Sequence, residues 1–195
     1  MDVQKCKTKK GVNINGPLLI SPNVYEDERG YFMESWNMRA FNQKIIRDII
    51  FVQDNHSKSK KNVLRGLHYQ MPPYDQGKLV RCIKGEIFDV FVDLRINSET
   101  FLLWAGEYLN DKNKSQLWIP SGFAHGFLTI TDTAEVLYKT TNYWSKDHEH
   151  TIKWDDNSIN IEWPLNGNLP IQSDKDKNAE NLNEISIKKL FKNDI

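Results

Sequence analysis

The central part of the chain is a series of short apolar segments separated by turn residues. From about residue 49 to residue 154 these segments are rich in valine, isoleucine, phenylalanine, tyrosine and tryptophan, which favour β-strands. The pattern predicts strands over residues 63–70, 79–83, 86–95, 101–109, 116–119, 127–130 and 135–141. Since no helical pattern lies between them, we predict an all-β fold, an antiparallel sandwich or barrel rather than a parallel sheet.

Helical patterns occur only at the edges of this strand-rich region. One covers residues 37–46, and a second covers residues 179–192, where Leu182, Ile185 and Leu190 form a weak apolar stripe. A length of 195 residues suits one domain with a sizeable core. We therefore predict a single domain over residues 1–195, with its core from about 14 to 176 and a helical extension from about 177 to 195.

The composition restricts which partners the protein is expected to bind and in which cellular compartment it is expected to act. Lysine plus arginine number 26 and aspartate plus glutamate number 26, so no excess of positive charge indicates binding to nucleic acid or to an anionic membrane. Cys6 and Cys82 are too few and too far apart for a secreted disulfide scaffold. The N-terminal lysines are not followed by an apolar h-region, and no apolar run reaches the roughly 20 residues of a membrane span. These features predict a cytoplasmic protein with two free thiols.

The segment 63–70 carries the first candidate for chemistry. In a regular strand Gly66, His68 and Gln70 share one face, and the missing side chain of Gly66 leaves room for a ligand. A single histidine on a strand is often a core residue, but the cations Arg65 and Lys78 nearby favour an anionic substrate or a developing oxyanion. Arg65 has the opposite parity to His68. Either Gly66 marks a β-bulge, or Arg65 serves the site of a neighbouring subunit.

The segment 119–127 contains a Pro-x-Gly-x-x-His pattern between two strands, which delivers His125 to the start of the next strand. It resembles the second sequence motif of the cupin barrels. In metal-binding cupins this histidine is a ligand together with a His-x-His pair and a glutamate. Here the pair reads His68-Tyr69-Gln70 and no glutamate follows at short spacing, so we expect no bound metal. The run 148–150 is interpreted as a polar stretch near the start of a strand rather than as a second metal site.

The segment 135–144 alternates, so Val136, Tyr138 and Thr140 share a face. An inward tyrosine usually packs with its hydroxyl satisfied. Only the presence of His68 elsewhere in the chain makes Tyr138 a candidate acid.

Taken together, these segments resemble the dTDP-4-dehydrorhamnose 3,5-epimerase family from about residue 14 to residue 176. The resemblance rests on motifs that occur in family order, at residues 29–34, 53–55, 64–70, 76–78, 92–95, 119–127, 138–141 and 161–164. It implies a jelly-roll cupin barrel, a homodimer that shares strands across its interface, and no cofactor.

The resemblance also implies roles for individual residues. His68 matches the general base, Tyr138 the general acid, and Lys78 the lysine near the C4 oxygen of the sugar. Asp176 matches the carboxylate that orients the histidine, although Asp174 is close enough to compete for that role. The positions that hold the nucleotide, its diphosphate or the sugar are Arg29, Phe32, Glu34, Gln53, Asn55, Arg65, His125, Trp144, Glu149 and Lys175. Trp144 differs from the tyrosine that usually stacks on the thymine in this family.

The expected activity is inversion of C3 and C5 of a dTDP-4-keto-6-deoxy sugar. A C–H bond beside a ketone needs a positioned base near neutral pKa, which His68 can supply, and a cation such as Lys78 at the developing enolate oxygen. Inversion requires a proton from the opposite face, which Tyr138 can supply. Three alternatives stay open: a single-centre 3- or 5-epimerase, a 3,4-ketoisomerase, and a non-catalytic carbohydrate-binding cupin module. A metal-dependent cupin oxygenase lacks the histidine that Gln70 replaces.

Overall fold

The computed structural model describes residues 1–192. The strands are β1 (Asp2–Lys7), β2 (Asn13–Ser21), β3 (Val24–Asp27), β4 (Gly30–Met33), β5 (Gln53–Lys60), β6 (Leu64–Gln70), β7 (Lys78–Lys84), β8 (Glu86–Asp93), β9 (Trp104–Asn110), β10 (Gln116–Ile119), β11 (Phe123–Thr129), β12 (Thr133–Thr140) and β13 (Glu149–Thr151). The helices are α1 (Met38–Lys44) and α2 (Asp174–Lys177), with 3₁₀ turns η1 (Leu182–Glu184) and η2 (Ile187–Lys189). No helix in the described range is long and apolar enough to cross a membrane.

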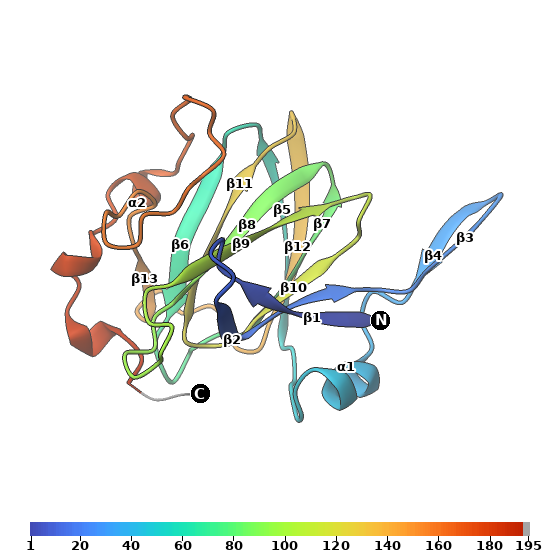
Figure 1. Ribbon diagram of the computed structural model, residues 1–195, viewed down its shortest axis with the longest axis horizontal. Helices are drawn as coiled ribbons and strands as arrows, with labels where there is room; N and C mark the ends of the chain where they lie inside the picture. The colour runs from blue at the N-terminus through green and yellow to red at the C-terminus, as the bar shows by residue number, and fades with distance from the viewer. Residues whose placement is uncertain (193–195) are drawn as a thin grey trace.

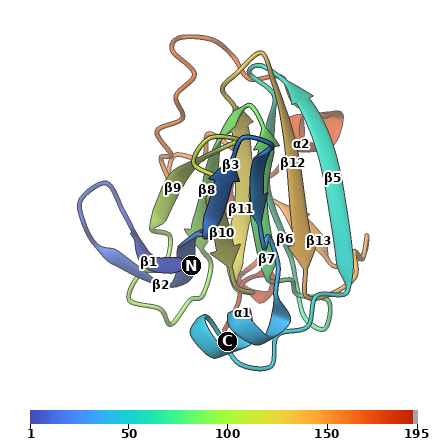
Figure 2. The same ribbon diagram turned by 90° about the vertical axis from the view of Figure 1, so that its right-hand side faces the viewer.

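The larger strands form a jelly-roll barrel of two antiparallel sheets, which confirms the predicted all-β fold (Figure 1). One sheet has the order β1-β2-β10-β7-β12-β5 and the other has the order β13-β6-β11-β8-β9. Figure 2 shows β5 and β9, one edge strand from each sheet, on opposite sides of the barrel. Because the two sheets face each other, side chains from β6 and β11 point toward side chains from β7 and β12 across the interior.

Strand β8 is apolar on both of its faces because each face packs in a different core. Ile87 and Phe91 pack in the core between the sheets. Phe88, Val90 and Val92 pack on the other face of the five-stranded sheet, in a second core that residues 182–191 help to cover. Covering segments therefore bury both faces of this strand.

Most predicted strands are confirmed within a few residues, but the strand predicted over 127–130 begins earlier. β11 starts at Phe123, so His125 lies within the strand rather than in the turn before it. The helix predicted over 37–46 is confirmed as α1, and Asn37 caps it by accepting a hydrogen bond from the backbone N–H of Ala40 at 3.0 Å.

The prediction of a helix over residues 179–192 is wrong. This segment contains only η1 and η2, and its apolar residues dock separately on the outer face of the five-stranded sheet. Asp156 accepts a hydrogen bond from the backbone N–H of Leu182 at 2.7 Å, which fixes where the segment meets the body. Tertiary contacts therefore outweigh a weak helical stripe. Residues 193–195 of the predicted extension lie outside the described residues.

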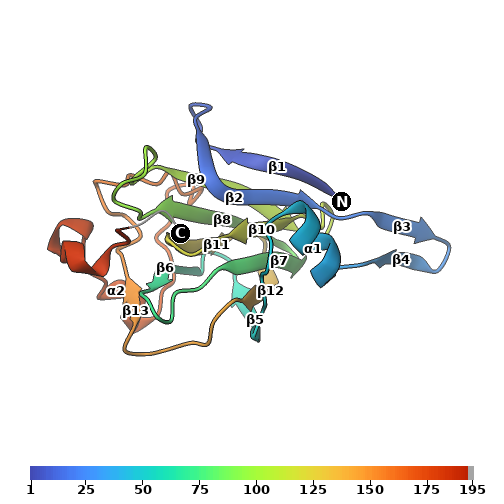
Figure 3. The same ribbon diagram turned by 90° about the horizontal axis from the view of Figure 1, so that it is seen from below.

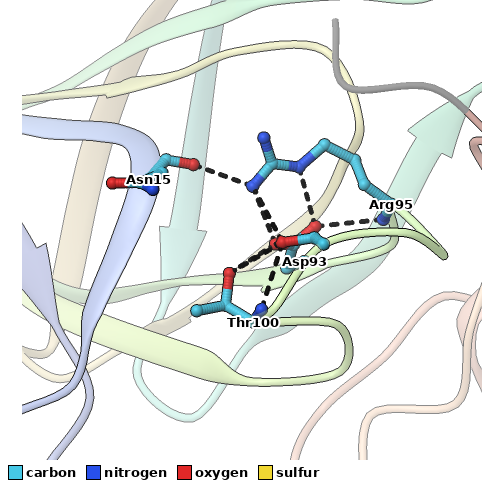
Figure 4. A network of polar contacts seen from close by, with 5 residues as sticks. Asn15, Asp93, Arg95 and Thr100 are labelled. Carbon is cyan, nitrogen blue, oxygen red and sulfur yellow. Dashed lines mark hydrogen bonds and ion pairs between the residues drawn. The ribbon is translucent and has the colours of Figure 1, made fainter.

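A buried ion pair joins the end of β8 to its surroundings (Figure 4). Asp93 accepts hydrogen bonds from the Arg95 guanidinium at 2.8 and 2.9 Å and from the Thr100 hydroxyl at 2.7 Å. Arg95 also donates to the Asn15 carbonyl at 2.8 Å. Because Gly122 leaves space for the Arg95 side chain, this network supports the turn that precedes β11. Removing one partner of such a pair typically costs about 3–5 kcal/mol.

Strands β3 and β4 form a hairpin that projects from the body of the protein. Figures 1 and 3 both place it at the end of the molecule opposite α2. Tyr25, Tyr31 and Phe32 on this hairpin are exposed. Exposed aromatic side chains on a projecting hairpin are typical of a surface that meets a partner.

Candidate active site

A cavity of about 580 Å³ opens beside β6 and α2. It is lined by nine of the residues predicted for the site: Arg65, His68, Lys78, His125, Tyr138, Trp144, Glu149, Lys175 and Asp176. These side chains come from both sheets, from α2 and from the loop between β12 and β13, so the barrel brings distant parts of the sequence to one place.

His68 and Asp176 form a hydrogen-bonded pair in this cavity. The distance from His68 Nε2 to Asp176 Oδ1 is 2.6 Å, and Asp176 is buried. Ser173 caps α2 by accepting a hydrogen bond from the Asp176 backbone N–H at 3.2 Å, which holds the carboxylate in place. Asp174 is exposed to solvent, so Asp176 is the carboxylate that contacts the histidine.

The pKa values of this pair move in directions that suit a base. Burial raises the pKa of Asp176, but the hydrogen bond and the charge of His68 outweigh it, so the pKa falls below its usual value of 3.8. Burial lowers the pKa of His68 below 6.5 and exceeds the opposing effect of Asp176. An ionised carboxylate only accepts hydrogen bonds, so His68 carries its proton on Nε2. Nδ1 then holds the free lone pair.

A β-bulge at Gly66 brings Arg65 and His68 to the same cavity. His125 and Phe127 of β11, two positions apart, pair with His68 and Arg65, which are three positions apart. The extra residue on β6 reverses the parity, so Arg65 needs no neighbouring subunit to reach this cavity. Arg65 Nε also donates to the Ser59 hydroxyl at 3.0 Å.

The space beside Gly66 does not hold a ligand, contrary to the sequence interpretation. A Cβ atom there would lie 2.5 Å from the Cα of Gly126, so the missing side chain admits the backbone of β11. Gly66 also has a φ of 128°, a backbone conformation that residues with a Cβ atom rarely adopt. Gly66 is thus required by the bulge.

Lys78 lies at the start of β7, is buried, and donates to the carbonyl of His68 at 3.3 Å. Burial lowers its pKa to about 8, while Glu149 and Asp89 partly oppose the shift. Lys78 is therefore a cation near neutral pH. Within residues 1–192 its ammonium forms no ion pair, so it is available to bind a negatively charged oxygen of a substrate.

Tyr138 reaches the cavity from β12, which belongs to the sheet opposite that of His68. The predicted common face of Val136, Tyr138 and Thr140 is confirmed, because all three side chains point toward the interior. Burial raises the pKa of Tyr138 above its ordinary value of 10.0, although Arg65 opposes the shift. The phenol is therefore protonated and can donate.

A second histidine–carboxylate pair lies beside the first. His125 Nε2 is 2.6 Å from Oδ1 of Asp89, and His125 pairs directly with His68 across β11 and β6. The sequence analysis did not include Asp89 in the site. The sequence does contain a signal for it: Asp89 is a charged residue that alternates with the apolar Ile87 and Phe91 within a mostly apolar strand.

Glu149 and Lys175 form an ion pair of 2.8 Å at the rim of the cavity. Burial raises the pKa of Glu149, but Lys175 outweighs this and the pKa is lower than usual. The run 148–150 stands at the start of β13, as predicted, and His148 Nδ1 is 2.8 Å from the hydroxyl of Ser145. Within residues 1–192, no three His, Cys, Asp or Glu side chains gather as a metal-binding group.

Five predicted site residues do not line this cavity: Arg29, Phe32, Glu34, Gln53 and Asn55. Arg29 lies at the tip of the projecting hairpin and pairs with Asp27 at 2.6 Å. Phe32 lies on β4 and Glu34 directly follows it, and both line a separate pocket together with Trp36. Gln53 and Asn55 lie on β5, where the Gln53 amide donates to Asn55 Oδ1 at 2.8 Å.

The family model described as dTDP-4-dehydrorhamnose 3,5-epimerase matches residues 11–184. The chain belongs to the dTDP-4-dehydrorhamnose 3,5-epimerase family. It is therefore an isomerase of the epimerase class, and the family resemblance of its motifs is confirmed.

Individual relatives agree with this family assignment. The dTDP-4-dehydrorhamnose 3,5-epimerase of Shigella flexneri is 58% identical over 163 residues, which cover 84% of this chain and 89% of the relative. A Legionella pneumophila dTDP-6-deoxy-D-glucose-3,5-epimerase in complex with dTDP-4-keto-L-rhamnose is 41% identical, with a TM-score of 0.91 and full coverage of both chains. ChmJ, a 3'-monoepimerase of Streptomyces bikiniensis, is 30% identical, with a TM-score of 0.85 over 92% of this chain and 90% of that chain.

Proposed function

We propose that this protein inverts C3 and C5 of dTDP-4-keto-6-deoxy-glucose to give dTDP-4-keto-L-rhamnose. The observation that carries the proposal is the placement of His68, with its Asp176 partner, and Tyr138 on opposite sheets around one cavity that also holds Lys78. A base and an acid on opposite walls are what inversion at carbon requires, because the proton leaves one face and returns to the other.

The first step is proton removal beside the C4 ketone. Nδ1 of His68 takes the proton from C3 or C5, and the electrons of the C–H bond move onto the C4 oxygen as an enolate. Asp176 stabilises the imidazolium that forms, since its carboxylate is buried and ionised. Lys78 donates a hydrogen bond to the enolate oxygen. No redox cofactor is needed, because carbon ends in the oxidation state in which it began.

The second step returns a proton to the opposite face of the same carbon. The phenol of Tyr138 is the donor, and its raised pKa keeps it protonated in the free enzyme. C3 and C5 both flank C4, so the same base, acid and lysine serve both carbons if the sugar shifts between the two events. Arg65, His125, Glu149 and Lys175 are then available to bind the diphosphate and the sugar, and Trp144 to stack on the base.

The protein is expected to act as a homodimer. Arg29, Phe32 and Glu34 belong to the predicted substrate-binding set, yet they lie at the end of the molecule opposite α2. A second copy that places its hairpin beside the first copy's cavity would unite the two parts of the set. Two unpaired thiols, Cys6 and Cys82, suit a reducing compartment, so the cytoplasm remains the expected location.

A single-centre epimerase is the second candidate. ChmJ, described as a 3'-monoepimerase, has a similar fold at 30% identity. Inversion at one carbon uses the same base, acid and lysine, so the site chemistry alone fits both activities. The orientation that the sugar can adopt in the cavity decides between them.

Incubation with dTDP-4-keto-6-deoxy-glucose, followed by proton NMR of the product, tests the proposal. Inversion at both C3 and C5 is the expected result. Inversion at C3 alone or at C5 alone would replace the proposal with the second candidate. Migration of the keto group to C3 would instead identify a 3,4-ketoisomerase.

The pH dependence of kcat/KM should be bell-shaped. His68 acts only when neutral, so activity is lost as the pH falls through its pKa, which lies below 6.5. Lys78 acts only when charged, so activity is lost as the pH rises through about 8. In Lys78→Arg the falling limb should move to higher pH, because a guanidinium keeps its proton. An unchanged falling limb in that variant would show that another group titrates there.

A further inference from the structure

Gln70, the last residue of β6, makes three hydrogen bonds with its side chain although it does not line the cavity. Its amide nitrogen donates to the backbone carbonyls of Tyr74 and Tyr143, the latter at 3.1 Å. Its amide oxygen accepts from the backbone N–H of Ser145 at 2.8 Å. The side chain is 4% exposed, so these bonds are shielded from water.

The three bonds join two loops, residues 71–77 and residues 141–148. The loops are also held to each other, because Gln76 donates to the carbonyl of Asn142 at 2.8 Å and Asn142 donates to the carbonyl of Pro73 at 2.8 Å. The backbone N–H of Gly77 donates to the hydroxyl of Thr141 at 2.8 Å. The two loops therefore form one unit at the end of the barrel, and Gln70 anchors it.

Trp144 is held from the other sheet as well. Its backbone N–H donates to the side-chain oxygen of Gln53 on β5 at 3.1 Å. Three consecutive residues, 143 to 145, thus have backbone groups bound by two glutamines, one from each sheet. The Trp144 side chain itself is 56% exposed at the rim of the cavity. The backbone of residue 144 is thus held by Gln53, and its ring lies beside Glu149 at the cavity rim.

We propose that Gln70 is a positioning residue for nucleotide binding, which, together with the bond from Gln53, holds the backbone of residues 143–145 so that the Trp144 ring is fixed before a base stacks on it. The inference rests on the proposed function, because it takes the ligand to be a dTDP-sugar. A ring that is fixed in advance loses less conformational entropy on binding, so affinity rises without any added contact. Gln70 does not line the cavity that holds His68, Lys78 and Tyr138, so the effect falls on KM rather than on kcat.

The same contacts explain why position 70 is a glutamine. A primary amide presents two N–H donors and one oxygen acceptor, and Gln70 uses all three. The histidine that metal-binding cupins carry at this position offers one donor and one acceptor when neutral. The glutamine at position 70 therefore binds the two loops rather than a metal ion.

The variant Gln70→Met tests the inference, because it keeps the length of the side chain and removes its three hydrogen bonds. The Kd for dTDP, measured by titration calorimetry, should rise roughly tenfold, because residues 143–145 must then be ordered when the nucleotide binds. KM for the dTDP-sugar should rise with it while kcat stays near the wild-type value. Gln4→Met, on the exposed surface of β1, is the matched control and should leave both unchanged.

A double-mutant cycle with Trp144→Ala shows whether the effect passes through the indole. If it does, Gln70→Met in the Trp144→Ala background should weaken dTDP binding no further. Additive losses, or unaltered dTDP binding by Gln70→Met, would overturn the inference. If Gln70→Met does not fold, Gln76→Met enters the same cycle, since it removes a bond that ties the same two loops to each other.

Failure of the proposed function gives a different result. A wild-type protein that binds dTDP but epimerises no sugar would defeat the epimerase proposal and leave the positioning role intact. A wild-type protein that does not bind dTDP would defeat both.

Discussion

His68→Ala should lower kcat by about 10²–10⁴-fold, the range that a positioned general base contributes. In the free enzyme His68 is neutral, keeps Nδ1 free and donates through Nε2 to Asp176 at 2.6 Å. His125 is the other histidine at the cavity and is paired in the same way with Asp89, but its side chain is only 9% exposed against 25% for His68, so His68 is the more accessible of the two to a substrate. The Kd for dTDP should remain near the wild-type value, since the nucleotide is held by other residues.

The matched control is His56→Ala on β5, where the ring is 53% exposed and faces Glu135. It should leave kcat unchanged. Thermal unfolding of both variants separates chemistry from folding, because His68→Ala leaves the buried Asp176 without its partner. If His68→Ala loses activity only in proportion to its unfolded fraction, His68 is a core residue and the base lies elsewhere.

Lys78→Met should lower kcat by about 10²–10³-fold, the usual effect of removing one donor to an oxyanion. The methionine keeps the unbranched stem but cannot stabilise negative charge on the C4 oxygen. Since the proposed enolate occurs in both epimerisations, inversion at C3 and at C5 should slow together. Single-turnover kinetics with dTDP-4-keto-6-deoxy-glucose measure each step.

Lys84→Met provides the comparison on the same strand, because Lys84 is exposed at the far end of β7. It should behave as the wild type. A Lys78→Met variant with normal kcat and a raised KM would assign Lys78 to substrate binding alone, and the enolate would need another donor.

The strand pattern predicted the barrel well where strands are apolar and poorly where they line the site. β5 (Gln53–Lys60) contains no large apolar residue, yet alternate positions face the interior. Gln53, Asn55, Ser57 and Ser59 are its partly or fully buried side chains. A method based on apolar periodicity misses such a strand, because its inward face is polar.

Contacts between residues far apart in the sequence also cannot be predicted from the pattern of apolar positions. His68 and Asp176 are 108 positions apart, and only the resemblance to a family suggested that they meet. The bulge at Gly66 was one of two alternatives, because the parity conflict between Arg65 and His68 is visible in the sequence but its solution depends on how β6 pairs with β11. Asp89 stands out as a charged residue in an apolar strand, but the sequence alone does not show which side chain it meets. Its partner His125 lies on the neighbouring strand.

The central claim is that His68 and Tyr138 exchange protons with both carbons beside one C4 enolate. Epimerisation of dTDP-4-keto-6-deoxy-glucose in deuterated water, followed by NMR and mass spectrometry of the product, tests it most directly. We predict deuterium at both C3 and C5 with the wild-type enzyme, and in Tyr138→Phe much slower inversion with C–H exchange that continues in the unreacted substrate. Product that is inverted at both carbons but carries no solvent deuterium at either would contradict proton exchange through His68 and Tyr138.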